Sequence, residues 1–537
     1  MSPRGERIEK LLPSLADVIF IGLTCIVVFA APLIILTGDG DLASHIRMGE
    51  RILATGGVPD IYAPTYTMAG EPFLGHAWGG EVVLALAHGA GGLAGVLALC
   101  GIVIGLVFTL QFRLLVREGA HAYVALAAAA IGAAGTALHW LGRSHLFTWY
   151  LAVALLLLLE TPRTKAWWLA PLFVVWVNLH GGFFFGLMLI GLYLAAAVLE
   201  AWTGVGAAPA ASEGGTTRLA AVRADPQVRR TATFLLVAAL ATLVNPSGPL
   251  HHVEVLGLLG NADIIDRINE FESPNFHRGF TTPFLLVLLG TLFAAAATRR
   301  RMPLRWILVV VACTYYALYS VRNIALFMVV AWPLIVVWLA RAYPRLRSLA
   351  RTSALTVRKA AEGPTRISFA FALALALVAA NEGRVGRAQV LVNGFSPEYF
   401  PVESVRAARE AGLEGPLFNE MIWGGYIVYS WPEQPVYIDG LLYTPGLLDE
   451  YIEIMNVRPG WKRALEERGV RLVLVPPKSQ LAEHLVGEPG WTLWRCDGTA
   501  AVIARGRPGA TGDEAREAMA RCEEEGEERR EQPRLME

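Results

Sequence analysis

Acidic, histidine and aromatic residues are concentrated between Gly38 and Glu81, directly after an apolar run long enough to cross a bilayer. The residues that could do chemistry there are Asp39, Asp41, His45, His76, Trp78 and Glu81. Ionisable residues gathered where an apolar helix leaves the membrane are by default a functional-site hypothesis. A carboxylate in such a place can take a proton from an attacking group or hold a metal ion.

The first part of this loop has a helical pattern. Apolar residues recur at helical spacing from Asp41 to Leu53, which predicts a short helix at the membrane surface. Asp41 and His45 are four residues apart and share one face of it. Asp41 can equally be an N-cap or first-turn residue whose carboxylate satisfies free N–H groups. A second short helix is expected to start near Trp78 and to carry Glu81.

The composition is that of a membrane protein. The chain has 537 residues, 54% of them hydrophobic and 17% charged, and a mean hydropathy of +0.45. Such values are typical of a polytopic α-helical membrane protein with some soluble mass. We expect about eleven transmembrane helices, within a range of roughly ten to thirteen. The apolar windows begin with Asp17–Thr37 and Leu93–Val116 and end with Ser368–Ala380.

Basic residues predict the orientation of the spans. They lie in short clusters beside the apolar windows, a pattern that gives no indication of nucleic-acid binding. One set of loops, from Arg4 to Arg366, holds most of them, so we expect this set to face the cytoplasm. The Gly38–Glu81 loop and everything after the last span are then extracytoplasmic.

Polar residues within apolar sequence fall mostly on that outer side. They include Arg143, Asn178, His180, Glu270 and Arg322. Polar groups buried near lipid are costly unless they pair or line a wet cavity. We therefore expect a polar cavity that opens outward, although each residue taken singly can be an ordinary helix-end residue.

The composition changes after about Glu382. Helical stretches alternate with short β-rich runs at Leu417–Phe418, Val436–Ile438, Leu472–Val475, Trp491–Trp494 and Ala501–Ala504. This alternation predicts a small α/β domain. We divide the chain into a transmembrane domain over 1–383, with its large first outer loop at 38–81, an extracytoplasmic α/β domain over 384–506 and a charged tail over 507–537. The tail is expected to be disordered, with a frayed helix as the alternative.

The order of these features resembles the GT-C superfamily of membrane glycosyltransferases, and more closely a widespread group of bacterial GT-C-like proteins. The matching motifs are Asp41-x3-His45-x3-Gly49, His76-x-Trp78-x2-Glu81, Asn178-x-His180-Gly181, Asn245-Pro246, Glu270-x3-Pro274, Asn419-x3-Trp423-Gly424-Gly425-Tyr426 and Val436-Tyr437-Ile438-Asp439-Gly440. GT-C enzymes have a cytoplasmic N-terminus, an acidic first outer loop with two interfacial helices and many spans. Often they also have an outer C-terminal domain. The resemblance covers the chain up to about Arg505.

This resemblance implies a function. GT-C enzymes use sugars linked to polyprenyl phosphate or polyprenyl diphosphate. The chain is thus expected to transfer a sugar from a polyprenyl-phosphate-linked donor to a glycan, lipid or protein acceptor. The reaction would take place at the outer face of a bacterial cytoplasmic membrane.

The resemblance also assigns roles to the acids of the first loop. In GT-C enzymes this acid is a catalytic base or a metal-associated group. Here the role falls to Asp41 first, to Asp39 second and to Glu81 next. Because Gly40 separates the two aspartates, the motif is not an adjacent acidic pair, and the need for a divalent metal stays open.

Sugar transfer also needs groups that hold the leaving phosphate, and planar Arg suits this better than Lys. Arg322 is our first candidate and Arg143 the second, although a snorkelling role at the membrane interface explains Arg322 as well. The remaining candidates for substrate binding are His45, His76, Trp78, Asn178, His180, Glu270, Trp423 and Asp439. Strand and turn packing accounts equally well for the last two.

Two other functions stay open. A transporter or flippase would place charges near mid-membrane and show repeated halves, whereas here the polar groups gather on one side. A catalytically inactive GT-C-like protein of envelope assembly would have no need of intact acids in the first loop.

Overall fold

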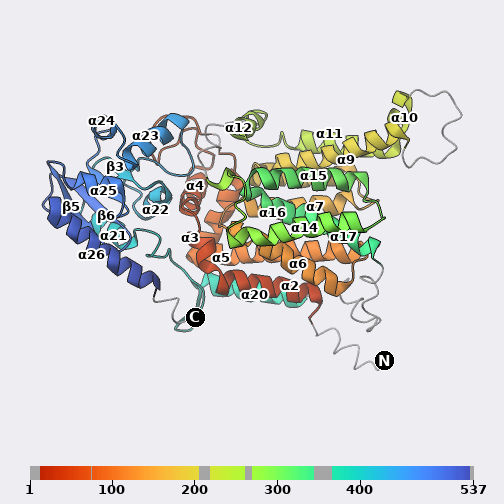
Figure 1. Ribbon diagram of the computed structural model, residues 1–537, viewed down its shortest axis with the longest axis horizontal. Helices are drawn as coiled ribbons and strands as arrows, with labels where there is room; N and C mark the ends of the chain where they lie inside the picture. Colours follow the sequence, from red (N-terminus) through yellow and green to blue (C-terminus); the bar gives the residue numbers. More distant parts are fainter. Residues whose placement is uncertain (1–12, 74, 205–217, 260–268, 344–365, 532–537) are drawn as a thin grey trace. The chain divides into compact units, whose positions relative to one another are not determined.

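The chain forms two compact units, each assembled from segments distant in sequence (Figure 1). The first unit comprises residues 1–30, 97–140 and 144–381, and the second comprises 31–96, 141–143 and 382–537. The computed structural model describes residues 13–73, 75–204, 218–259, 269–343 and 366–531.

The first unit is helical. Its elements are α2 (Leu15–Cys25), η1 (Ile26–Ala30), the part of α5 (Trp78–Arg117) after Val96, α6 (Ala122–Thr136), η2 (Ala137–His139), α7 (His145–Leu159), η3 (Ala166–Trp168), α8 (Leu169–Leu179), α9 (Phe183–Thr203), α10 (Arg218–Ala224), α11 (Pro226–Ala241), α12 (Leu250–Leu259), η5 (Asn269–Phe271), η6 (Gly279–Thr281), α14 (Thr282–Ala297), α15 (Leu304–Tyr319), η7 (Val321–Asn323), α16 (Ile324–Leu326), η8 (Phe327–Ala331), α17 (Trp332–Ala342) and α20 (Arg366–Ala380). Figure 1 shows α9, α11 and α15 side by side.

Several helices could cross a membrane. Five described segments are long and apolar enough: Trp78–Arg117, Ala122–His139, Phe183–Thr203, Gly279–Ala297 and Val321–Ala342. Shorter apolar segments are Leu15–Ala30, His145–Leu159, Ala166–Leu179, Leu304–Tyr319 and Arg366–Ala380. Large apolar side chains lie on the surface, such as Phe293 on α14, which is 75% exposed, as expected for helices that face lipid. The full count of about eleven spans stays a prediction.

The first apolar window is divided rather than continuous. α2 and the π-helical turn η1 run to Ala30, and α3 (Pro32–Thr37) begins two residues later, after Ala31. Pro32 is the first residue of α3, because its ring fits the start of a helix but lacks the N–H that would continue a preceding one.

The helix predicted at Trp78 begins there but does not end before the next window. It continues into the apolar run as α5, and the backbone is non-helical only at Gly91 and Gly92. Gly92 has a φ of 61°, which glycine adopts readily.

The second unit contains α/β elements and the first loop. Its elements are α3, α4 (Asp41–Thr55), the start of α5, β1 (Arg384–Val385), β2 (Ala388–Gln389), α21 (Val402–Glu410), β3 (Leu417–Asn419), α22 (Met421–Ser430), α23 (Pro445–Met455), α24 (Trp461–Glu467), β4 (Leu472–Val475), α25 (Gln480–Leu485), β5 (Trp491–Cys496), β6 (Ala501–Arg505) and α26 (Gly512–Glu531).

A four-stranded sheet in the order β3-β4-β6-β5 forms the centre of this unit. β3 and β4 are parallel and the other pairs antiparallel. Successive side chains of a strand point to opposite faces. Val473 and Val475 pack in one cluster with α23 to α26, and Leu472 and Leu474 in another with α21 and α22. Helices therefore cover both faces, which explains why β4 is apolar throughout.

The strand predicted at Val436–Ile438 does not form over its full length. Val436–Ile438 forms only single bridges, from Val436 to Thr65 and Leu417. The side chain of Asn419 takes the place of a strand partner. Its Oδ1 accepts the N–H of Tyr437 at 2.9 Å, and its Nδ2 donates to the carbonyl oxygen of Ile438 at 2.9 Å.

The tail from residue 507 contains a helix, which is the alternative that we gave above to a disordered tail. In α26, Ala515 and Met519 lie four residues apart and are buried in the cluster on one face of the sheet. This pair gives the charged helix an apolar contact with the sheet.

Candidate active site

Arg143 joins the two aspartates of the first loop. Its Nε donates to Asp39 Oδ2 at 2.7 Å, and its Nη2 lies 2.7 Å from Asp41 Oδ2. The side chains of Arg143, Asp39 and Asp41 are 21%, 10% and 20% exposed. We call these three residues the acid–arginine cluster, and none of them is completely buried.

The start of α4 separates the roles of the two aspartates. Asp41 is the first residue of α4, after Gly40 at the N-cap. Its N–H donates to Asp39 Oδ1 at 2.7 Å. Asp39 thus satisfies the first free N–H of the helix, and the Asp41 carboxylate faces Arg143.

Glycines allow α4 to approach the C-terminal elements. An added Cβ at Gly440 would overlap Asp41 Oδ1, and one at Gly425 would overlap the carbonyl oxygen of Gly40. A Cβ at Gly40 would in turn overlap the backbone of Ile422. The motif glycines in α22 and after Asp439 are therefore needed for close contact with the loop that holds the acids.

Asp439 is completely buried beneath this contact. The hydroxyls of Tyr62 and Ser44 donate to its Oδ2, and the N–H of Leu441 donates to its Oδ1 at 3.1 Å. Burial raises the pKa of Asp439 to about 6, although hydrogen bonds from Tyr62 and Leu441 oppose the shift. Asp439 connects the first loop to the α/β part of the unit.

His45 of α4 and Glu81 of α5 form a second polar contact in this unit. His45 Nδ1 lies 3.1 Å from Glu81 Oε1, and the two residues are only 7% and 2% exposed. Burial alone would lower the pKa of His45, but the hydrogen bond and charge of Glu81 and the charge of Asp41 outweigh it and raise the pKa. Glu81 Oε2 is buried and has no hydrogen-bond partner among the described residues.

A further polar network was not predicted. Glu50 lies 2.6 Å from Arg47 Nη1 and 3.1 Å from His88 Nδ1. His88 Nε2 lies 2.8 Å from the hydroxyl of Tyr429. Only Arg47 and Glu50, three residues apart on α4, give a local sequence signal, because His88 and Tyr429 lie far from them in the sequence.

The other predicted residues of the second unit lie among packed side chains. Trp423 is 5% exposed, and its indole N–H donates to the carbonyl oxygen of Tyr399 at 2.9 Å. Trp78, at the start of α5, packs beside the cluster that contains Tyr62. His76 is half-buried just before it.

Two predicted residues of the first unit have backbone partners near helix ends. Asn178 Nδ2 donates to the carbonyl oxygen of Val244 at 2.8 Å. His180 Nδ1 accepts the N–H of Gly182 at 2.9 Å and lies 2.9 Å from Thr148 Oγ1. This arrangement places the proton of the neutral ring on Nε2.

Arg322 and Glu270 lie in adjoining short turns of the first unit. The guanidinium carbon of Arg322 is 4.7 Å from the centre of the Phe271 ring. Ser320 Oγ donates to the carbonyl oxygen of Glu270 at 2.9 Å. The turns η5 and η7 are held together by these contacts.

Comparisons with known proteins identify the fold. Neither a protein-family model nor a curated protein matches the chain. The Archaeoglobus fulgidus oligosaccharyltransferase, solved with a tethered acceptor peptide containing the NVT sequon, aligns with a TM-score of 0.54 and 13% identity. The alignment covers 86% of this chain and 69% of that one. The chain shares the GT-C fold.

A second structure agrees. AglB from Archaeoglobus fulgidus, in complex with an inhibitory peptide and a dolichol-phosphate, aligns with a TM-score of 0.52 and 12% identity, and the alignment again covers 86% of this chain and 69% of that one. The expected GT-C-like helical fold with a small sheet region is thus confirmed. The bacterial subgroup stays a prediction.

The acid–arginine cluster does not fit a divalent cation as it stands. The two carboxylates that would be ligands are both paired with Arg143. In the part of the chain that the structure describes, no three His, Cys, Asp or Glu side chains are grouped as a metal site would require. Arg143 supplies positive charge between the acids instead.

Proposed function

We propose that the protein is a membrane glycosyltransferase. It transfers a sugar from a polyprenyl-phosphate-linked donor to a glycan, lipid or protein acceptor at the outer face of the membrane. The GT-C fold and the apolar helices support this proposal. The observation that carries it is the acid–arginine cluster at the start of α4.

The proposal includes the topology expected from the basic loops. About eleven helices of residues 1–383 cross a bacterial cytoplasmic membrane. The N-terminus is cytoplasmic, and the 38–81 loop and residues 384–506 are extracytoplasmic, with 507–537 as an appended charged segment.

Asp41 acts as the base. Its carboxylate takes the proton from the hydroxyl or amide of the acceptor while the acceptor atom bonds to C1 of the sugar. The bond between C1 and the phosphate oxygen breaks, and the polyprenyl phosphate leaves. Asp39 is kept ionised beside it, because the charge and hydrogen bond of Arg143 outweigh burial and lower its pKa.

Arg143 holds the leaving phosphate in this scheme, ahead of Arg322. A planar guanidinium can bind phosphate oxygens while it stays fixed by neighbouring carboxylates. Arg143 contacts both candidate acids. His45, one turn after Asp41 on α4, and its partner Glu81 on α5 orient the acceptor or the acid.

The test is transfer of a labelled sugar by the purified, full-length protein in lipid nanodiscs. A panel of polyprenyl-phosphate and polyprenyl-diphosphate sugars is supplied with peptide, lipid and glycan acceptors. We expect one donor to be consumed and its label to appear on an acceptor. A lipid-linked sugar that crosses reconstituted vesicles without cleavage would instead favour a flippase. No cleavage and no crossing for any donor would favour the inactive assembly protein.

A further inference from the structure

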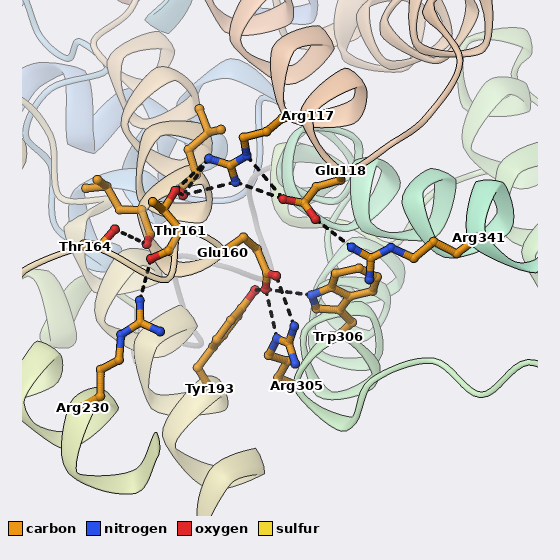
Figure 2. A network of polar contacts seen from close by, with 12 residues as sticks. Arg117, Glu118, Glu160, Thr161, Thr164, Tyr193, Arg230, Arg305, Trp306 and Arg341 are labelled. Atoms are coloured by element: carbon orange, nitrogen blue, oxygen red, sulfur yellow. Dashed lines mark hydrogen bonds and ion pairs between the residues drawn. The ribbon is translucent and has the colours of Figure 1, made fainter. Parts of the chain in front are cut away.

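A basic cleft lies in the first unit, among η3, α10 and α11. Its volume is ≈ 480 Å³. Arg229 and Arg230 line it, together with Thr164, Ala166 and Phe234 among others. The lining thus carries two arginines and no acid. Figure 2 shows one of these arginines, Arg230, reaching toward Thr161.

Arg230 forms no ion pair with any described residue, although the negative charge of Glu160 lies near enough to act on it. Its Nη2 donates to the carbonyl oxygen of Thr161 at 2.7 Å, and its guanidinium carbon lies 4.9 Å from the centre of the Phe234 ring. Its Nε is buried and lacks a hydrogen-bond partner in the described structure. A buried cationic donor left without an acceptor is costly, so an anion here would be stabilising.

Arg229 adds a second charge at the surface. It is exposed, and its Nε donates to the carbonyl oxygen of Arg223 at 2.7 Å. Among the described residues neither Arg229 nor Arg230 forms an ion pair. Arg163 and Lys165, the exposed neighbours of Thr164 in sequence, also form none within the described ranges.

The nearby acids are already engaged. Asp225 accepts the N–H groups of Gln227 and Val228 at 2.8 and 2.9 Å as the N-cap of α11. Glu160 accepts two hydrogen bonds from Arg305, at 3.1 and 3.2 Å. Figure 2 shows Arg305, Trp306 and Tyr193 converging on Glu160. The described residues that line the cleft include two arginines and no acid, so the lining itself carries a net positive charge.

An apolar stripe leads away from these charges along α11. Leu236 and Leu240 follow Arg229 by seven and eleven residues, so they share its face of the helix. The two leucines are 59% and 56% exposed. Trp167 of η3, which contacts α11 as an element, is 63% exposed, and such indoles favour the membrane interface.

We propose that this surface binds an anionic phospholipid. The phosphodiester lies between Arg229 and Arg230, and the acyl chains lie along Leu236 and Leu240. The lipid belongs to the leaflet that meets the basic loops. Charge complementarity selects a net negative head group, and the exposed leucines select a molecule with acyl chains rather than a free phosphate.

The experiment measures lipid binding to the delipidated, full-length protein by native mass spectrometry. Dioleoyl phosphatidylglycerol is titrated against dioleoyl phosphatidylcholine, inorganic phosphate and polyprenyl phosphate. We expect saturable binding of phosphatidylglycerol only. Arg229→Gln should weaken it roughly five-fold, and Arg229→Gln with Arg230→Gln roughly 25-fold. Arg301→Gln, which removes an exposed arginine outside the cleft, should bind like the wild type.

Arg229→Gln alone keeps the test valid if the double variant is unstable, because Arg229 is exposed and Arg230 stays in place. Equal affinity in Arg229→Gln and wild type would overturn the proposal. Equal binding of phosphatidylcholine would also overturn it, since charge would then not matter. If millimolar inorganic phosphate displaced phosphatidylglycerol, the cleft would be a general anion site and not a lipid site. Preferential binding of polyprenyl phosphate would assign it to the donor.

Discussion

At the scale of single residues, Arg143 makes a pair of contacts that a lysine side chain could not reproduce. One guanidinium reaches both Asp39 and Asp41 through different nitrogen atoms, whereas an ammonium group is a single point charge. We expect Arg143→Lys to lower sugar transfer roughly 10- to 100-fold. The measurement is transfer rate and donor affinity of the purified variant.

Arg322→Lys is the matched comparison. If Arg143 holds the phosphate, Arg322→Lys keeps its affinity for the donor. The contact of Arg322 with the Phe271 ring needs a cation but not a planar guanidinium, so lysine can replace it. A loss of donor affinity in Arg322→Lys with none in Arg143→Lys would exchange the two roles.

Because Asp439 has a raised pKa in the folded state, we predict that the stability of the protein depends on pH. Its pKa rises from 3.8 to about 6 on folding, so the folded state binds the proton more tightly than the unfolded state. Its contribution is fully present below about pH 4 and is lost as the pH rises to about 6. Asp439→Asn keeps the size and removes the titration, so it should flatten this part of the profile.

The measurement is the apparent melting temperature of both proteins between pH 4 and 7. The difference in melting temperature between wild type and Asp439→Asn should change most below pH 6. A difference that stays constant over this range would show that Asp439 does not titrate there.

At the scale of elements, the contact between α4 and the loop after Ile438 positions Asp41. A methyl group at Gly440 would overlap Asp41 Oδ1. We expect Gly440→Ala to lower transfer by roughly 100-fold, since a displacement near 1 Å can have such an effect. Gly446→Ala, at the start of α23, has open space around it and should transfer at the normal rate.

The measurement is transfer rate together with melting temperature for both variants. Normal transfer by Gly440→Ala would show that Asp41 need not lie against this loop.

Many elements could be predicted from local sequence because their signals are local. Apolar periodicity marks α21 to α25 and the strands β3 to β6. Side-chain caps mark the starts of α23 and α25. The helix from Asp41 ends at Gly56, which has a φ of 74°. The extent of α5 was not predictable, because a pair of glycines usually ends a helix and here only distorts it.

The site itself depends on contacts between distant parts of the sequence. Types and spacing were enough to single out Asp39, Asp41 and Arg143, but not to predict that one guanidinium joins both acids. Ser44 and Tyr62, which donate to Asp439, were missed because no local pattern distinguishes such hydroxyls from ordinary surface groups.

At the scale of the whole molecule, the first loop and the C-terminal α/β segment belong to one unit. If both lie outside the membrane, the basic loops must lie inside. An alkaline phosphatase fusion after Glu450 should be active, and a fusion after Arg341 inactive. The reverse pattern would place the acid–arginine cluster on the cytoplasmic side and contradict the proposed outer-face reaction.

The central proposal is that the Asp41 carboxylate removes the acceptor proton, and Asp41→Asn tests it most directly. The amide keeps the size, and Arg143 keeps its bond to Asp39, so the melting temperature should change little. Transfer from the polyprenyl-linked donor should fall by roughly two to four orders of magnitude, and less in Asp39→Asn. If Asp41→Asn transfers sugar at the normal rate, Asp41 is not the base, and Glu81, with its buried and unpartnered Oε2 among the described residues, becomes the next candidate.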